Sequence, residues 1–365
     1  MNSSMLVINI ISSYSGGGAE FLVRSVDRHI QSSFYDNETL YFNKDSLDKV
    51  NFCKSEQELS ISSRNFLAIF KIRKYLISKL KTHDCIVLHA HLTWPLFYVA
   101  IASLGLNLHL IYTEHSTFNK RRNYPYLKFI DRWAYSRYEK IIGISKATST
   151  SLLNWLGTRY QNKIITIENG AELSQFTPRE NLPTDRKLKL LSVGSLKHLK
   201  GFETTIRSLQ AVKDIVSSYT IVGSGPDLDR LQNLAKECGV DDIIHFAGWS
   251  DNPESFYQDA DVLLIPSHWE GFGLVAVEGL STGLPVIASN VSGLNEVVSE
   301  ELLSSILIDN FKEPDEWCAA INVMKELLEG SAKELSLASR AQSENFNIEK
   351  MLNAYEELYI ELSQK

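Results

Sequence analysis

Residues 263–287, LLIPSHWEGFGLVAVEGLSTGLPVI, contain the pattern on which the fold assignment depends. This pattern predicts a buried strand, a loop with Glu270 and two glycines, a short helix that begins at Leu274 and carries Glu278, and a second buried strand. An apolar helix between two apolar strands is typical of a parallel α/β sheet. Because the two carboxylates lie on either side of the helix start, we expect them in a binding site.

The same alternation of strands and helices extends through the rest of the chain. In the first half, apolar strands are predicted at residues 5–11, 85–89, 108–113, 141–145 and 164–168. A polar segment with two prolines, 177–187, follows and is predicted as a linker. The alternation then resumes, so we expect two doubly wound, Rossmann-like domains at 1–176 and 188–344. An amphipathic helix is predicted for 345–365.

Composition excludes several classes of protein. The chain has 365 residues, too many for one ordinary core, and its 44% hydrophobic and 22% charged residues are typical of a soluble protein. Its four cysteines form no C-x-x-C pair, which argues for a reducing compartment and against a disulfide framework or a zinc site. Run 94–110 is interrupted by proline and polar residues, so a buried helix is expected there and no membrane span. No cationic segment precedes the apolar run 5–11, so a signal peptide is not expected. We therefore expect a cytoplasmic location.

The two halves of the chain differ in charge. Residues 1–175 contain 21 Lys and Arg against 14 Asp and Glu, whereas the remaining residues contain 16 against 30. Segment 118–140 mixes Lys and Arg with aromatic residues, which suits a lipid headgroup interface. It would also suit nucleic acid, but no recognition motif accompanies it. We therefore expect the first domain to contact an anionic membrane surface. The basic amphipathic helix at 64–81, taken alone, is better explained as a surface helix packed on the sheet.

Two features of the first domain suggest a ligand at the carboxyl ends of its strands. Gly16 and Gly17 lie between strand 5–11 and a helix, and a glycine-rich loop there lets the backbone approach a ligand. The spacing is not G-x-G-x-x-G, so a dinucleotide fingerprint is not predicted. His91 and His115 each follow a strand, where ligands bind in open α/β sheets.

The second domain offers the parts of a nucleotide-sugar site. The helix after Gly273 presents free amides and a positive dipole end, which can hold phosphate. Glu270 and Glu278 could each accept hydrogen bonds from sugar hydroxyls on the two sides of a diphosphate. Cations are then needed near the phosphates, and Lys200 and Lys197 are the candidates. The alternative, that Glu278 is a solvated helix residue, is disfavoured because the helix is otherwise apolar.

Two further motifs bear on this site. Gly223 begins a Gly-Ser-Gly-Pro turn that could also approach a ligand. Asp259-Ala260-Asp261 has the form of the D-x-D metal motif of some sugar transferases. It precedes a strand, however, and no third oxygen ligand is suggested nearby, so we predict no metal site.

The stretch EGFGLVAVE, with seven residues between Glu270 and Glu278, resembles the signature of the large retaining glycosyltransferase family four, which has the GT-B fold. Four other stretches agree with this family, and the resemblance covers nearly the whole chain. It implies two Rossmann-like domains facing across a cleft, with the acceptor in the first and the nucleotide-sugar donor in the second. The C-terminal helix would cross back to the first domain. It also implies retention of anomeric configuration and no metal. The agreeing stretches are GGGAE (16–20), ENGAELSQF (168–176), VGSLKHLKGFETTI (193–206), and VGSGPDLDRL (222–231) with HFAGW (245–249).

Carried over residue by residue, the resemblance assigns roles to the candidate residues. Glu278 would bind the ribose and Glu270 the transferred sugar, while Lys200 would neutralise the leaving diphosphate. His115 would lie beside the transferred sugar. No covalent nucleophile is implied; the acceptor would attack on the face that the diphosphate leaves. The remaining donor-binding positions are Gly16, Gly17, Ser195, Gly223, Gly271, Phe272, Gly273 and Leu274.

Two departures from the family pattern affect the functional prediction. Ser195 stands where Arg is usual, and Glu172 where Asp is commoner. We predict transfer of a hexose or N-acetylhexosamine, from UDP by preference, to a lipid-linked saccharide in cell-surface polysaccharide synthesis of the bacterial type. The alternatives are a nucleotide-sugar epimerase of the same fold and a membrane-associated binding protein that lacks transferase activity.

Overall fold

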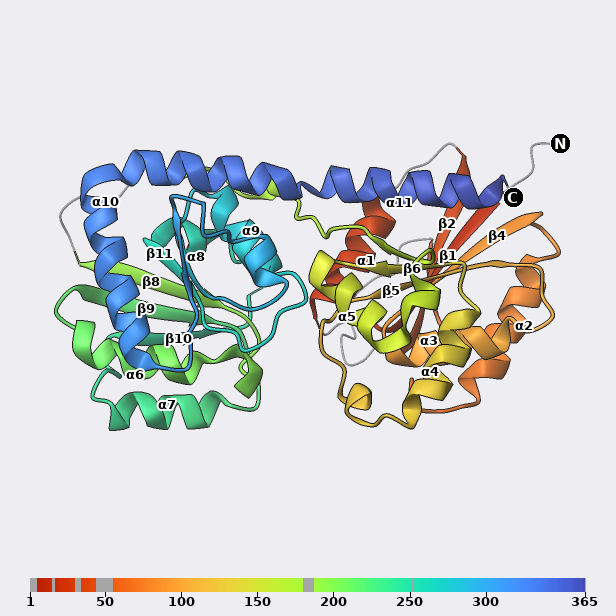
Figure 1. Cartoon of the computed structure of the whole chain (residues 1–365), viewed down its shortest axis with the longest axis horizontal. Coiled ribbons are helices and arrows are strands. Elements are labelled where there is room, and N and C mark those ends of the chain that lie inside the picture. Colours follow the sequence, from red (N-terminus) through yellow and green to blue (C-terminus); the bar gives the residue numbers. More distant parts are fainter. Residues whose placement is uncertain are drawn as a thin grey trace. The chain divides into compact units, whose positions relative to one another are not determined.

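The computed structural model describes residues 5–14, 17–29, 34–43, 55–179, 187–250 and 252–364. The chain divides into two compact units, residues 1–168 with 350–365, and residues 169–349 (Figure 1). The first unit therefore ends before residue 176, the predicted end of the first domain. The residues after Glu168 belong to the second unit because they bond to it. For example, the Arg179 amide donates to the Thr282 carbonyl at 3.0 Å.

The first unit is built on a seven-stranded parallel sheet of order β3-β2-β1-β4-β5-β6-β7. The central strands are buried along nearly their whole length, as expected of a parallel sheet covered on both faces. The strands are β1 (Met5–Ser13), β2 (Tyr35–Asn43), β3 (Glu56–Glu58), β4 (Cys85–His91), β5 (His109–Glu114), β6 (Lys140–Gly143) and β7 (Ile164–Thr166). The helices are α1 (Gly18–His29), α2 (Ala68–Lys79), α3 (Thr93–Ala102), α4 (Leu127–Ser136), α5 (Lys146–Leu156) and most of α11 (Ile348–Ser363).

Several predicted boundaries in this unit were wrong. The apolar run 94–110 divides into helix α3 and strand β5, because the chain turns at Gly105, whose φ is 74°. The predicted helix 64–81 is shorter and begins at Ala68. Among the described residues, no helix is both long and apolar enough to cross a bilayer.

The second unit contains a six-stranded parallel sheet of order β10-β9-β8-β11-β12-β13. Counted within the unit this is 3-2-1-4-5-6, the order of doubly wound nucleotide-binding sheets, in which ligands bind where the order reverses. The reversal lies between β8 and β11. The strands are β8 (Leu188–Val193), β9 (Val216–Val222), β10 (Ile244–Gly248), β11 (Val262–Ile265), β12 (Val286–Ser289) and β13 (Ser305–Ile308). The helices are α6 (Phe202–Val212), α7 (Leu228–Glu237), α8 (Glu254–Asp259), α9 (Leu274–Ser281) and α10 (Pro314–Ser343).

The last two helices follow the second sheet in the chain. Helix α10 is kinked at Ser331, whose φ of −144° and ψ of 28° are not helical. Helix α11 packs on the first sheet through two tyrosines. The hydroxyl of Tyr359 lies 2.8 Å from His89 Nδ1, and that of Tyr355 lies 3.4 Å from Thr113 Oγ1.

Candidate active site

In the second unit, the loops that follow β8, β9 and β11 meet at one edge of the sheet. The amide of His268 donates to the Leu199 carbonyl at 2.8 Å, and the amide of Leu196 donates to the Ser224 carbonyl at 2.9 Å. Parallel strands all end at this edge, so residues far apart in the sequence come together here. Most of the predicted donor-binding positions of this unit lie on the loops after β8 and β11.

Lys200 and Glu270 form an ion pair at this edge. Lys200 Nζ lies 2.6 Å from Glu270 Oε1, and the hydroxyl of Ser267 donates to the same oxygen at 2.7 Å. The two side chains are only 25% and 15% exposed. An ion pair this shielded holds both groups in a defined geometry, and removal of one partner leaves the other poorly compensated. Ser267 was not predicted from the sequence.

The start of helix α9 has no side-chain cap. Its N-cap is Gly273, which has a φ of 99° and no side chain to accept from the first amides. The following turn begins at Leu274, and Gly271 lies in the preceding loop, as predicted. Phe272 differs from these residues because the whole residue is only 2% exposed and its ring packs edge-on against Phe346. Contact of its amide with a donor stays a prediction.

Glu278 lies one turn inside α9 and accepts a hydrogen bond from the hydroxyl of Tyr257 at 2.7 Å. Burial raises the pKa of the Glu278 carboxyl to about 7, while this hydrogen bond opposes the rise. Such an environment does not fit a solvated helix residue. It does fit a carboxyl group that can gain or lose its proton near neutral pH.

Gly223 has a structural reason of its own to be glycine. A Cβ there would lie 1.9 Å from the carbonyl oxygen of Gly194, and its φ is 146°. The close approach is thus to the loop after β8, and contact of Gly223 with a donor stays a prediction. Ser195, in the same loop, is half-buried.

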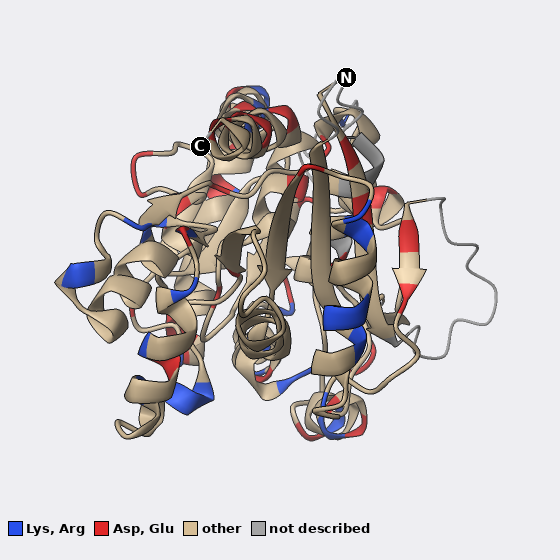
Figure 2. Ribbon diagram, turned by 90° about the vertical axis from the view of Figure 1, so that its right-hand side faces the viewer, with Lys and Arg blue, Asp and Glu red and all other residues tan. Residues whose placement is uncertain are grey.

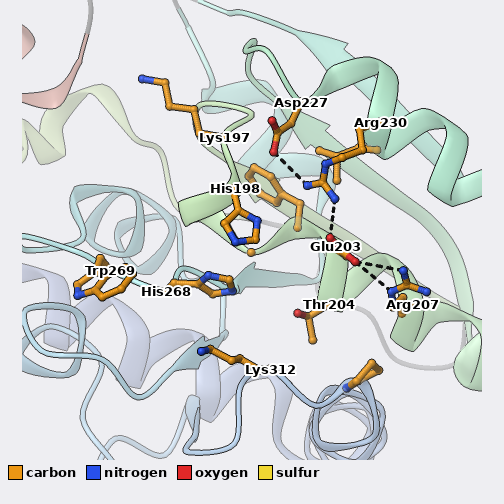
Figure 3. A pocket seen from close by; sticks show the side chains of 14 residues that line it. Lys197, His198, Glu203, Thr204, Arg207, Asp227, Arg230, His268, Trp269 and Lys312 are labelled. Atoms are coloured by element: carbon orange, nitrogen blue, oxygen red, sulfur yellow. Dashed lines mark hydrogen bonds and ion pairs between the residues drawn. The ribbon is translucent and has the colours of Figure 1, made fainter. Parts of the chain in front are cut away.

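Beside this edge lies a hollow of about 410 Å³ that is rich in cations (Figure 3). On one wall Glu203 pairs with both Arg207 and Arg230, and Asp227 also pairs with Arg230, so two carboxylates balance the two guanidinium groups. Burial and the nearby charges of His198 and Lys312 lower the pKa of His268. Lys197 also lines the hollow, but in Figure 3 its side chain points away from the other cations. A role of Lys197 near the phosphates stays a prediction.

In the first unit, His115 follows β5 and belongs to a group of three neighbouring imidazoles. Its Nε2 lies 3.1 Å from His91 Nδ1, and the rings of His91 and His89 lie 4.0 Å apart. Burial lowers the pKa of His115 to about 4 and the pKa values of the other two well below their usual range. All three rings are therefore neutral at neutral pH, and His115 offers one donor and one acceptor nitrogen rather than a positive charge.

The glycine-rich loop after β1 is described only in part, because Gly16 lies outside the described residues. Gly17 is exposed at the start of α1. The hydroxyl of Ser13 donates to Glu20 Oε1 at 3.0 Å and so joins the two ends of the loop. Because β1 and β5 are parallel, Gly17 and His115 follow strands that end at the same edge of the first sheet.

The acidic residues at 259–261 have partners within the protein. The Asp261 carboxylate accepts from the Lys189 amide at 2.8 Å, and Asp259 pairs with the Lys189 side chain. Within the described ranges, no group of three or more His, Cys, Asp or Glu side chains is placed to hold a metal ion.

Comparison with known families agrees with this geometry. Residues 17–175 match the model described as Glycosyltransferase Family 4, and residues 174–343 match the model described as Glycosyl transferases group 1. An uncharacterized glycosyltransferase of Haemophilus influenzae is 26% identical over 360 residues, covering 93% of this chain and 96% of that protein.

Solved structures show the same fold. Sucrose-phosphate synthase from Thermosynechococcus elongatus superimposes with a TM-score of 0.84 at 20% identity, covering 99% of both chains. Anabaena HepE in complex with UDP-glucose superimposes with a TM-score of 0.82 at 18% identity, covering 99% of this chain and 100% of that one. With one family model on each half and these neighbours over its full length, the chain is a GT-B glycosyltransferase of the family 4-like type.

Proposed function

We propose that the protein is a retaining transferase that moves a hexose or N-acetylhexosamine from a UDP-sugar to a saccharide acceptor. The observation that carries this proposal is the Lys200–Glu270 pair beside the open amides of α9, with Glu278 one turn further on. A cation, unpaired amides and two carboxyl groups suit a diphosphate flanked by two sets of hydroxyls. The HepE complexes with UDP and UDP-glucose support UDP as the carrier.

The proposed reaction places negative charge on the leaving diphosphate while the sugar becomes oxocarbenium-like. Lys200 and the first amides of α9 would stabilise that charge as preorganised electrostatics. Lys200 already donates to Glu270. A diphosphate would therefore share this cation, and the Glu270 carboxylate would accept from sugar hydroxyls as well. We propose that no metal takes part and that the departing phosphate accepts the proton of the acceptor hydroxyl.

A panel of UDP-, GDP- and ADP-sugars in a thermal-shift assay tests the donor. A ligand that binds only the folded protein stabilises it by mass action and so raises its melting temperature. At a free ligand concentration of a hundred times Kd, the free energy of unfolding rises by about 2.7 kcal/mol. We expect a shift with UDP-sugars and little or none with the others. A larger shift with GDP- or ADP-sugars would contradict the assignment of the base.

The acceptor part of the proposal is a lipid-linked saccharide at an anionic membrane surface on the cytoplasmic face. Support comes from α4, where Phe129 is 76% exposed and Trp133 is 43% exposed. Both line a hollow of about 560 Å³ together with Arg132, Arg159 and Lys163. In Figure 2, which faces the first unit, Lys and Arg residues are spread over several helices. Exposed rings among cations suit lipid headgroups.

This hollow does not coincide with the reacting edge of the sheet. Lys163 precedes strand β7, whereas His115 follows strand β5, so they lie at opposite ends of parallel strands. Strand β5 has six residues and thus spans about 20 Å. We propose that the hollow holds headgroups while the saccharide of the acceptor extends to the edge that carries His115.

Flotation with anionic liposomes at low salt tests the membrane contact. Replacing Phe129 and Trp133 by Ser should reduce the bound fraction severalfold. Val323→Ser is the matched control, because Val323 is 48% exposed on α10 of the second unit. Equal flotation of all three proteins, or no flotation of the native one, would contradict the proposed surface.

Labelled donor distinguishes transfer from the alternatives. Transfer of label to a lipid extract supports the proposal, whereas a changed free nucleotide sugar would identify an epimerase. Binding of donor without either product would identify a binding protein, for which the missing arginine at Ser195 is the favourable observation.

A further inference from the structure

We propose that Asn9 and His91 are positioning residues that hold the His115 ring in one tautomer, with the proton on Nε2 and a bare Nδ1. This inference rests on the proposed function, in which His115 acts beside the transferred sugar. The sequence indicates His91 only as a second histidine at a strand end, and it carries no signal for Asn9.

The direction of each hydrogen bond between Asn9, His91 and His115 follows from the bond that the Asn9 amide group donates. Asn9 Nδ2 lies 3.2 Å from Asn37 Oδ1 and donates to it, which turns Asn9 Oδ1 toward His91. That oxygen lies 3.3 Å from His91 Nε2. An amide oxygen can only accept, so the proton of His91 must be on Nε2.

The tautomer of His91 then sets that of His115. A neutral imidazole carries one proton, so His91 Nδ1 is bare when Nε2 is protonated. His91 Nδ1 lies 3.1 Å from His115 Nε2 and can accept from it. His115 is therefore protonated on Nε2, and its Nδ1 keeps a lone pair that can accept a hydrogen bond from a substrate hydroxyl.

Burial keeps water from competing for this chain of hydrogen bonds. Asn9 is 1% exposed and His91 is 3% exposed, so water cannot replace either partner. Burial also lowers the pKa of His91, which removes the doubly protonated form that would donate from both nitrogens.

A layer beneath supports the chain of bonds. His89 lies against His91 with a centroid distance of 4.0 Å, and its own nitrogens bond to Thr113 and Tyr359 at 2.7 and 2.8 Å. Asn9 pairs with His89 across β1 and β4, and His91 pairs with Thr113 across β4 and β5. Three adjacent strands thus fix the rings, and His91 cannot rotate without breaking a buried network.

The first measurement is the ¹⁵N NMR signal of the His115 ring nitrogens, assigned by comparison with His115→Ala. In the native protein we expect Nε2 protonated and Nδ1 bare. His91→Phe keeps the ring volume but removes the acceptor, so His115 should populate both tautomers. His91→Gln, whose amide can donate and accept, should restore part of the native signal. An unchanged tautomer in His91→Phe would overturn the proposal, since a purely structural ring has no effect on that proton.

The second measurement is kinetic. We expect His91→Phe to lower kcat by about tenfold to a hundredfold, by analogy with the loss of a group that orients a metal-ligating histidine. The KM for the donor should change little, because most of the proposed donor-binding residues, Lys200, Glu270 and Glu278 among them, belong to the second unit. A rise in donor KM with normal kcat would contradict a positioning role. Asn9→Leu, which removes the first acceptor, is a second variant that should act in the same direction.

The failure of this inference can be told from failure of the proposed function. If His115→Ala lowers kcat but His91→Phe does not, only the positioning role is wrong. If His115→Ala has no effect on transfer, the catalytic role of His115 is wrong, and the NMR signal still decides the tautomer.

Discussion

At the scale of single residues, the ion pair of Lys200 with Glu270 predicts how turnover responds to the loss of Lys200. Lys200→Ala should lower turnover by about tenfold to a thousandfold, as loss of one preorganised donor to a transition-state charge typically does. The measurement is kcat under saturating donor. Lys236→Ala, on the exposed side of α7, is the control and should leave turnover unchanged. Near-normal turnover in Lys200→Ala would rule out its role at the leaving group.

Glu278 predicts a pH dependence of donor binding. Its carboxyl pKa is raised to about 7 by burial, so the carboxylate form increases between about pH 6 and pH 8. An ionised acceptor makes the stronger hydrogen bond to a hydroxyl. We expect the Kd for UDP-glucose to fall by about fivefold to tenfold across this range, in proportion to the ionised fraction. Calorimetry measures it, and UDP-glucose is chosen because its diphosphate does not titrate there.

Glu278→Gln is the control for that experiment, because an amide has no proton to lose in this range. Its donor affinity should be weaker than that of the native protein at about pH 8 and flat with pH. An equally steep pH dependence in the variant would assign the effect to another group.

The sequence predicted these residues unequally. Glu270, Glu278 and Lys200 could be found because their spacing within one stretch, or their place at a strand end, points to the same edge of a sheet. Ser267 and Tyr257 could not, because a serine before a loop and a tyrosine on a polar helix carry no local signal. Their roles appear only when the loop folds back on the strand end, or when α8 lies beside α9.

At the scale of elements, the loop after β12 supports the loop that carries Glu270. Gly293 has a φ of 91°, and a Cβ there would lie 2.8 Å from the carbonyl oxygens of both Glu270 and Gly271. Gly293→Ala should therefore lower the free energy of unfolding by about 1 kcal/mol or more and weaken donor binding. Urea unfolding and calorimetry measure the two effects.

Gly330→Ala is the matched control for this substitution. Gly330 lies in α10, and a Cβ there would meet no atom within 4 Å. Alanine is favoured over glycine in a helix by roughly 1 kcal/mol, so the free energy of unfolding should be unchanged or higher. Equal free energies of unfolding and equal donor affinities in the two variants would show that the contact of Gly293 with the Glu270 loop does not support stability or donor binding.

Elements with a strong apolar period could be predicted, and those with weak patterns could not. The strand, helix and strand predicted within residues 263–287 are present as β11, α9 and β12, and α9 begins at Leu274 as predicted. Strand β2 was missed because its sequence, YDNETLYFN, begins with polar residues, and β3 was missed because it has only three. Strand β2 owes its structure to pairing with β1, and β3 owes its structure to pairing with β2, and these are contacts between separate segments of the chain.

At the scale of the whole molecule, the buried histidines make the first unit sensitive to acid. The pKa values of His89, His91 and His115 are lowered in the folded state, so the unfolded chain binds more protons below about pH 6.5. Stability contributed by these groups is complete above that pH and is lost as the pH falls toward about 4. Glu278 has the opposite sign, because its raised pKa adds stability below about pH 7 in the second unit.

Hydrogen exchange at about pH 7 and pH 5 separates the two units and measures this effect. Amides of β1, β4 and β5 should lose protection at the lower pH, while those of β11 and β12 should not. Uniform loss of protection in both sheets would show that other groups dominate acid unfolding.

The architecture of two doubly wound units could be predicted, since strands and helices alternate along almost the entire chain. The segment that connects the two units was predicted less accurately. A polar segment with two prolines suggested a linker at 177–187, yet Thr177 and Arg179 bond to the second unit. Composition shows where the chain is polar, but the boundary between the two units depends on which residues the polar segment contacts in the folded protein.

The route of the chain has a consequence for its synthesis. Residues 169–349 form one continuous unit, whereas the other unit is assembled from residues 1–168 and most of α11. Near the point of return, Ala171 pairs with Asn347, and Gly170 lies so close to Ile348 that a Cβ would be 2.6 Å from its Cα. On the ribosome, the inserted unit can therefore complete its core before the enclosing one does. The tyrosines that close the histidine layer follow the inserted unit in the chain, so this layer is finished only after that unit has been synthesised.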